Sequence, residues 1–366
     1  MKNATISTTS RCLVTSLAAV GFSLLVASDA SAQSTWGQAS GGTYDWNNSG
    51  NWTGGIPNAA GATAQLTNAI TGPVTVDLGS TNETTGTLKI GASTANTFTL
   101  SSTGGGVLIF RSTAGTTGTG ITEASNNADI ISAPLQINDT GGLTITDTAS
   151  TATLTISGGI TSAAGAENLV IKSNGGGSVL LSTGSINNQG TITNSGTGTN
   201  TTVISSTIGS NVTGVTQSGT FSALTLSGAN SSYAGTTTLT TGTLNIANAA
   251  ALGTGTLTIS GGTLDNTSSG SLTNSGNNAI NINGNFTYNG TQSLNLGSGA
   301  VAATTGSKTI TVNANTLELD GTITGAGTMN LVKQGSGTLV LGGNGSTWSG
   351  STTDGGGTLL ITGSVN

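Results

Sequence analysis

The side chains that could support catalysis are few and scattered in this sequence. It contains no His, and its single Cys is Cys12, close to the N-terminus. Serine triads of the Ser-His-Asp kind, cysteine-protease dyads and the usual zinc sites therefore each lack a required residue. Carboxylates and isolated basic side chains are the groups that remain.

Glu318 and Asp320 are the closest pair of acids that alternate along an expected strand. Residues two apart project from the same face of a strand, where two carboxylates can act as acid and base or bind calcium. Leu317 and Leu319 occupy the alternate positions, however, and apolar residues take the inward face. We therefore expect both acids to be solvated charges on the outside, where they discourage pairing with other chains.

Arg111 and Lys172 are the basic residues to weigh for a polysaccharide-cleaving site. Pectate lyases and polygalacturonases use clusters of Asp, Arg and Lys, but here each basic residue stands alone in the sequence. The calcium-binding pattern G-G-x-G-x-D is also missing, because Asp354 precedes a run of glycines instead of following one. The sequence thus predicts no catalytic residue, no cofactor and no metal site.

Four aromatic residues, Trp36, Tyr44, Trp46 and Trp52, gather near the N-terminus of a chain that is only 3% aromatic. Flat rings with polar tips can stack on sugars, so these residues are candidates for glycan binding. Alternatively, they form a cap that shields the open end of a repetitive core from water. We favour the cap, over residues 33–62.

Beyond this region the chain is built for β structure. Its 366 residues include 60 Gly, 3 Pro and only 5% charged residues, while Thr recurs in alternation with Leu, Ile and Val. Leu143-Thr144-Ile145 and Leu257-Thr258-Ile259 are typical, and their period of two indicates half-buried strands. Large apolar residues are too sparse for one thick core, so we expect a β-solenoid over residues 63–366.

An internal repeat supports the solenoid. A shift of 115 residues superposes the segment 221–246 on the C-terminal segment, with Tyr233 over Trp348 and a shared Gly-Thr-Leu unit. Within each copy this unit recurs after 20 residues, which we interpret as one coil. Coils of about 20–25 residues predict roughly 13–17 coils. We expect Leu339, Leu341, Leu359 and Ile361 to lie inside them.

These segments resemble a known bacterial family. The stretch Leu331-Val332-Lys333-Gln334-Gly335-Ser336-Gly337-Thr338-Leu339-Val340-Leu341 is similar to the autotransporter-associated β-strand repeat, L-x-K-x-G-x-G-T-L-x-L. Repeats of this type lie near 220–266, without the Lys-x-Gly-x-Gly lead-in, and at 331–364. The block from Tyr44 to Pro57 also resembles the opening of large exported proteins that carry these repeats. The resemblance implies a right-handed parallel β-helix, all-β, exported to the cell surface.

The N-terminus predicts export. Lys2 and Arg11 precede an apolar run, and Ala30-Ser31-Ala32 matches an A-x-A cleavage site, so residues 1–32 are interpreted as a signal peptide. The alternative, an uncleaved anchor, is less consistent with an apolar run this short. The whole chain has a net charge of −6, which disfavours nucleic acid and anionic membranes as partners. We expect no transmembrane segment in the mature chain.

We predict a non-catalytic surface or passenger β-helix with a structural, adhesive or cell-envelope role, located outside the cell or at the outer membrane. Its expected partner is a cell-surface glycan or a protein ligand. The alternative is a β-helix that binds or cleaves polysaccharide. Self-translocating autotransporters end in a membrane barrel, and this sequence carries no such segment after its last repeat. We therefore expect a longer reading frame or another export route.

Cleavage after Ala32 is the first testable prediction. Removal of residues 1–32 should leave a mature chain that begins at Gln33. N-terminal sequencing of protein recovered from the medium or the cell surface measures this directly. Protein retained in the cytoplasm with Met1 in place would contradict the prediction of export.

Overall fold

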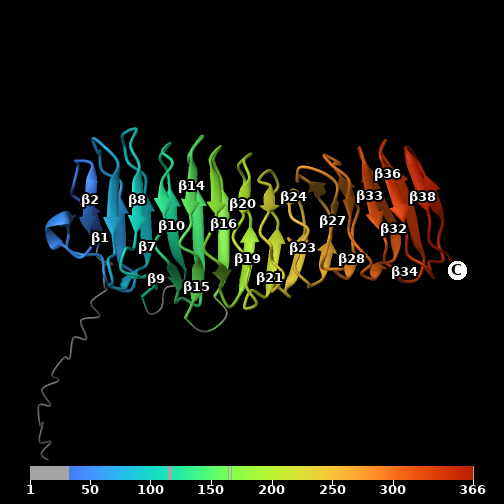
Figure 1. Cartoon of the computed structure of the whole chain (residues 1–366), viewed down its shortest axis with the longest axis horizontal. Coiled ribbons are helices and arrows are strands. Elements are labelled where there is room, and N and C mark those ends of the chain that lie inside the picture. Colours follow the sequence, from blue (N-terminus) through green and yellow to red (C-terminus); the bar gives the residue numbers. More distant parts are fainter. Residues whose placement is uncertain (1–32, 114–117, 164, 166, 366) are drawn as a thin grey trace, which may run out of the picture. The chain divides into compact units, whose positions relative to one another are not determined.

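The computed structural model describes residues 33–113, 118–163, 165 and 167–365, which form a parallel β-helix of about 13 turns. The expected signal peptide at 1–32 lies outside the described residues. Apart from the single turn of 3-10 helix η1 (Ser49–Asn51), the elements are strands, and successive coils stack from β1 to β38 (Figure 1). No helix of the described part is long and apolar enough to cross a membrane.

Two 14-stranded sheets run the length of the solenoid. The first sheet contains, in spatial order, β3 (Trp52–Thr53), β1 (Gln33–Trp36), β4 (Thr63–Leu66), β7 (Thr87–Ile90), β10 (Thr119–Glu123), β13 (Leu143–Asp147), β16 (Leu169–Ser173), β19 (Thr191–Asn194), β21 (Gly214–Gln217), β23 (Thr236–Leu239), β25 (Leu257–Ile259), β28 (Ile280–Ile282), β31 (Val301–Ala303) and β34 (Ile323–Gly325). The second sheet contains β2 (Gly42–Asp45), β5 (Val74–Asp77), β8 (Phe98–Ser101), β11 (Ile130–Ile131), β14 (Thr153–Ile156), β17 (Ser178–Leu181), β20 (Thr202–Ile204), β22 (Leu224–Leu226), β24 (Thr243–Ile246), β26 (Thr263–Asn266), β29 (Phe286–Tyr288), β32 (Gly306–Val312), β35 (Met329–Gln334) and β37 (Thr352–Asp354).

A third face carries two shorter sheets. Near the N-terminus these strands are β6 (Glu83–Thr85), β9 (Leu108–Phe110), β12 (Leu135–Ile137), β15 (Ile160–Ser162) and β18 (Ile186–Asn187). Near the C-terminus they are β27 (Leu272–Thr273), β30 (Leu294–Asn295), β33 (Thr316–Leu319), β36 (Thr338–Leu341) and β38 (Thr358–Ile361). Between β18 and β27 the described coils contribute strands to the first two sheets only.

The alternation in the sequence sets the core. In β13, Leu143 and Ile145 point inward and are fully buried, while Thr144 and Thr146 face outward. Ile145 pairs with Ile121 of the preceding coil and with Ile171 of the next, so like residues stack along the axis. The prediction of an all-β parallel solenoid with apolar residues inside is confirmed.

The predicted coil length is also confirmed where the repeats mark it. Thr243 pairs with Thr263, and Thr338 pairs with Thr358, so the 20-residue spacing is one turn of the solenoid in both copies. Gly242, which precedes the first of these strands, has a φ of +70°. A β-carbon there would collide with the carbonyl oxygen of Gly219 in the coil below, so glycine permits both the turn and the close approach.

The two repeat copies occupy different faces. Leu224 of the first copy lies in the second sheet, whereas Leu339 of the other lies on the third face. Tyr233 is fully buried in its turn, where its hydroxyl donates to the carbonyl of Thr236 at 2.9 Å. Tyr233 therefore packs the turn in which it lies.

Lys333, from the Lys-x-Gly-x-Gly lead-in, is fully buried in the other copy, and its pKa is lowered by burial. Its ammonium donates to the carbonyls of Gly335 and Gly356, at 2.8 and 2.7 Å. The charge of Lys333 therefore links the turn at Gly335 to the turn of the next coil.

The last coil departs from the expected burial. Leu339 and Leu341 are inside as predicted, but Leu359 is only partly buried and Ile361 is 43% exposed. The prediction is wrong for Ile361 because no coil among the described residues packs over β38.

A pair of substitutions within β22 tests the inward and outward assignment. Leu226 is fully buried, whereas the neighbouring Thr225 faces outward and accepts a hydrogen bond from Asn245. Leu226→Asp should cost about 3–5 kcal/mol because it buries an unpaired charge, and Thr225→Asp about 1 kcal/mol or less. Thermal melts followed by circular dichroism measure both, and equal losses would contradict the assignment.

Candidate functional site

The N-terminal aromatic residues form a buried cluster. The rings of Trp36 and Trp52 meet edge to face with centroids 4.9 Å apart, and Trp46 and Trp52 do the same at 4.8 Å. Trp52 Nε1 donates to the carbonyl of Trp46 at 2.8 Å. Exposure is at most 7% for these three rings, so none offers a free face to a sugar.

Tyr44 is the partly exposed member of the four. It contacts Trp36 edge to face at 6.0 Å, and its hydroxyl donates to the carbonyl of Ser40. The cluster closes the solenoid where β3 pairs antiparallel with β1, the only antiparallel pairing among the described strands. These residues therefore cover the end of the core as a cap. Three of the four rings that were candidates for stacking on a sugar are buried.

The isolated ionisable residues remain isolated in three dimensions. Arg111 is exposed beyond the end of β9, and Lys172 lies on the outward side of β16. Glu318 and Asp320 face outward and are half-buried, and Asn295 of the preceding coil donates to both carboxylates at 2.8 Å. Partial burial and the neighbouring charge of Asp320 raise the pKa of Glu318. The structure brings neither basic residue to this pair.

A group of buried carboxylates was not predicted. Glu123 and Asp147 end β10 and β13, pair with each other across the first sheet, and are fully buried. Asp129, which precedes β11, is equally buried and accepts a hydrogen bond of 2.5 Å from the amide of Phe98. Oε2 of Glu123 and Oδ2 of Asp147 have no hydrogen-bond partner.

These surroundings favour the protonated acids. Burial, together with the neighbouring carboxyl group of Asp129, raises the pKa of Glu123 to about 9. Burial also raises the pKa of Asp147 to about 6, and it raises the pKa of Asp129. Ser125 contacts both Glu123 and Asp129, since its amide donates to Glu123 and its hydroxyl donates to Asp129.

The sequence did contain a signal for these acids. In Thr119-Gly120-Ile121-Thr122-Glu123 the alternation that buries Ile121 also assigns Glu123 to the inward face. Asp147 follows Ile145 in the same way. Because the side chains are enclosed, a substrate has no access to them, and no group of three or more possible metal ligands occurs among the described residues.

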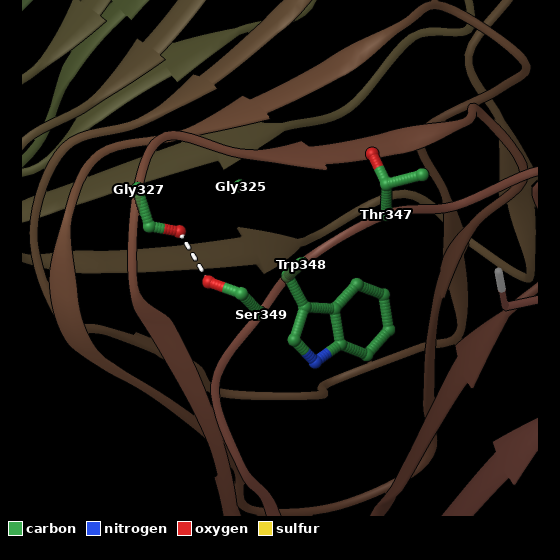
Figure 2. Close-up of a pocket in the computed structure, with 5 residues that line it drawn as sticks. All are labelled: Gly325, Gly327, Thr347, Trp348 and Ser349. Atoms are coloured by element: carbon green, nitrogen blue, oxygen red, sulfur yellow. Dashed lines mark hydrogen bonds between the residues drawn. The ribbon is translucent and has the colours of Figure 1, made fainter.

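A shallow groove lies beside Trp348 in the last coils, with a volume of about 410 Å³. Gly325, Gly327, Thr347 and Ser349 line it with the indole, and Ser349 donates to the carbonyl of Gly327 at 2.9 Å (Figure 2). The groove thus combines a half-exposed ring with hydroxyls and glycine backbone, and no charged side chain lines it.

The same position in the first copy is covered. There the turn of the next coil packs on Tyr233, and the amide of Thr254 donates to the Tyr233 carbonyl at 2.8 Å. No described coil packs on Trp348 in this way. The groove is therefore open among the described residues, and its indole ring and hydroxyl groups suit contact with a sugar.

Comparisons with known proteins identified no family for this chain. No family profile, curated protein or solved structure matches it. The resemblance to autotransporter-associated repeats therefore stays a prediction.

The buried acids generate a pH prediction. A carboxyl whose folded pKa is raised binds a proton in the folded state that the unfolded chain has already released, so stability falls as pH rises between the two pKa values. For Asp147 this window runs from about 4 to 6, and for Glu123 from about 4 to 9. Asp77 and Asp139 have lowered pKa values, so their opposite effect is confined to more acidic pH.

We expect the melting temperature to fall by a few degrees from pH 5 to pH 9. Glu123→Gln should flatten the decline above pH 6, since it removes the group that titrates there. Glu318→Gln is the control, and because its carboxyl group is only half-buried the decline above pH 6 should persist. A melting temperature that rises from pH 5 to pH 9 would contradict the burial of neutral acids.

Proposed function

We propose that this chain is an exported, non-catalytic β-helix with a structural, adhesive or cell-envelope role. The observation that carries the proposal is the distribution of ionisable groups. The acids with the most strongly raised pKa values, Glu123 and Asp147, face the core. The outward positions of the sheets are mainly Thr, Ser and Asn, which suits a long contact surface, and these side chains do not act as general acids or bases.

The N-terminal pattern of residues 1–32 and the resemblance to autotransporter-associated repeats support export. The fold is compatible with both, because a β-helix carries its binding surface along its sides and needs no separate catalytic cleft. Cell fractionation together with protease shaving of intact cells tests the location. Protein found only in the cytoplasm would overturn the proposal.

The groove at Trp348 favours one second candidate, a polysaccharide-binding β-helix. Trp348→Ala should then abolish retention on the insoluble polysaccharide that retains the unaltered chain, because the ring supplies the stacking surface. Phe221→Ala is the control, since Phe221 is 69% exposed and lies outside the groove. Equal loss in both variants, or no retention of the unaltered chain on any glycan tested, would exclude this candidate.

Turnover is the outcome that separates the non-catalytic proposal from a polysaccharide-cleaving enzyme. We expect no release of reducing ends from plant or bacterial glycans. Release that disappears in Glu318→Gln or Asp320→Asn would show that the half-buried pair is catalytic, and would reject the non-catalytic proposal.

A further inference from the structure

The outward side of the first sheet carries an ordered array of hydroxyl groups in four successive coils. In its central column, Thr193 pairs with Thr216, Thr216 with Thr238, and Thr238 with Thr258. Each belongs to the middle of a strand whose inward neighbours are buried. The column is therefore held in register by the same ladder that builds the core.

A column lies on each side of the central one, at the next outward positions of the same coils. We call all three columns together the hydroxyl array. It comprises Thr191, Gly214, Thr236 and Thr256 in one outer column, Thr193, Thr216, Thr238 and Thr258 in the centre, and Ser195, Ser218, Thr240 and Ser260 in the other outer column. Eleven of these twelve residues bear a hydroxyl group, and none is charged.

The central hydroxyls are free to bind something outside the protein. Each of the four threonines is partly exposed. Among the described residues, no side chain or backbone group forms a hydrogen bond with their Oγ1 atoms, in contrast to Thr191, which donates to Asn168, and Ser218, which donates to the carbonyl of Asn194. A threonine presents a methyl group beside a hydroxyl that both donates and accepts.

The spacing of the array is regular in two directions. Paired strands lie about 4.8 Å apart, and alternate residues of one strand are roughly 6.7 Å apart. Strong twist would spoil this lattice over several coils, and a large sheet that neither curls nor splits is flattened. The first sheet runs unbroken through 14 strands, and its coils stack along one axis (Figure 1), so the hydroxyls keep their spacing.

We propose that the hydroxyl array binds ice. Hexagonal ice presents rows of oxygen atoms at comparable repeats in two directions, and each surface water both donates and accepts hydrogen bonds. Ions fit poorly into ice, so a surface that adsorbs to it must be uncharged, as this array is. Lys172 on the coil before the array and Asn281 on the coil after it mark its ends. The inference concerns a surface property of the folded chain and does not depend on the proposed cellular role.

Other ligands fit the array less well. An anion or a metal ion requires charged or converging groups, whereas these side chains project in parallel from a sheet. A second copy of the chain would need a complementary or apolar surface, and the exposed large apolar residues lie elsewhere, at Ile130, Phe221, Leu360, Ile361 and Val365. A crystalline polysaccharide also has a two-dimensional repeat, and the experiment distinguishes it.

Ice-affinity partition of the purified mature chain tests the proposal. A growing ice front should incorporate the unaltered protein, and incorporation should fall by about tenfold or more in the double variant Thr216→Tyr/Thr238→Tyr, because the bulky rings hold the lattice away from the remaining hydroxyls. The matched control is Thr75→Tyr/Thr99→Tyr, which alters two paired outward threonines on the second sheet. Circular dichroism and melting temperature verify that both variants fold.

Retention of ice binding in the control and its loss in the array variant would support the proposal. Exclusion of the unaltered protein from ice would overturn it, and so would equal behaviour of the two variants. Binding to crystalline cellulose or chitin that is lost only in the array variant, with exclusion from ice, would assign the array to a polysaccharide and reject ice as its ligand. None of these results bears on where the protein is located, which fractionation determines separately.

Discussion

The in-register parallel pairing between successive coils is the constraint on which the rest of this structure depends. Every coil receives backbone hydrogen bonds from the coil before it and offers its own to the next, and in parallel pairing a shift by one residue would turn every inward side chain outward. Ile121, Ile145 and Ile171 show the result, since each covers the same residue type one coil away. This register therefore fixes which residues lie in the core, in the turns and on the outward surface.

The same constraint explains why acids are found inside. Once Ile121 and Ile145 fix the inward phase of β10 and β13, the residue two positions later must also face inward, whatever its chemistry. Glu123 and Asp147 occupy those positions. The fold raises the pKa of both groups by burying them, to about 9 for Glu123 and about 6 for Asp147, and supplies hydrogen bonds from nearby backbone amides. Lys333 is accommodated differently, because its long stem lets the ammonium reach two carbonyls at a turn.

Local alternation and the repeat were sufficient to predict the strands, the solenoid and the length of a coil. They were insufficient where a property depends on what lies above or below a residue. Trp36, Trp46 and Trp52 are close in sequence, which left both a cap and a sugar-stacking surface open. Only their mutual packing and the antiparallel strand β3 show that they form a cap. Ile361 has the pattern of a core residue and is exposed because no described coil covers it. The hydroxyl array is likewise invisible in the sequence, since coils of unequal length separate Thr193, Thr216, Thr238 and Thr258.

The placement of the two repeat copies on different faces has a consequence for how such a chain diversifies. Counting from β22, the second sheet receives β24, β26, β29, β32 and β35 before the chain reaches β36 on the third face. The 115-residue offset therefore corresponds to five complete turns plus an advance of one face. A segment repeated at this interval points in a new direction around the axis and keeps its pairing one coil apart, as Thr243 with Thr263 and Thr338 with Thr358 show. One repeated sequence unit can therefore contribute strands to different sheets of the same solenoid.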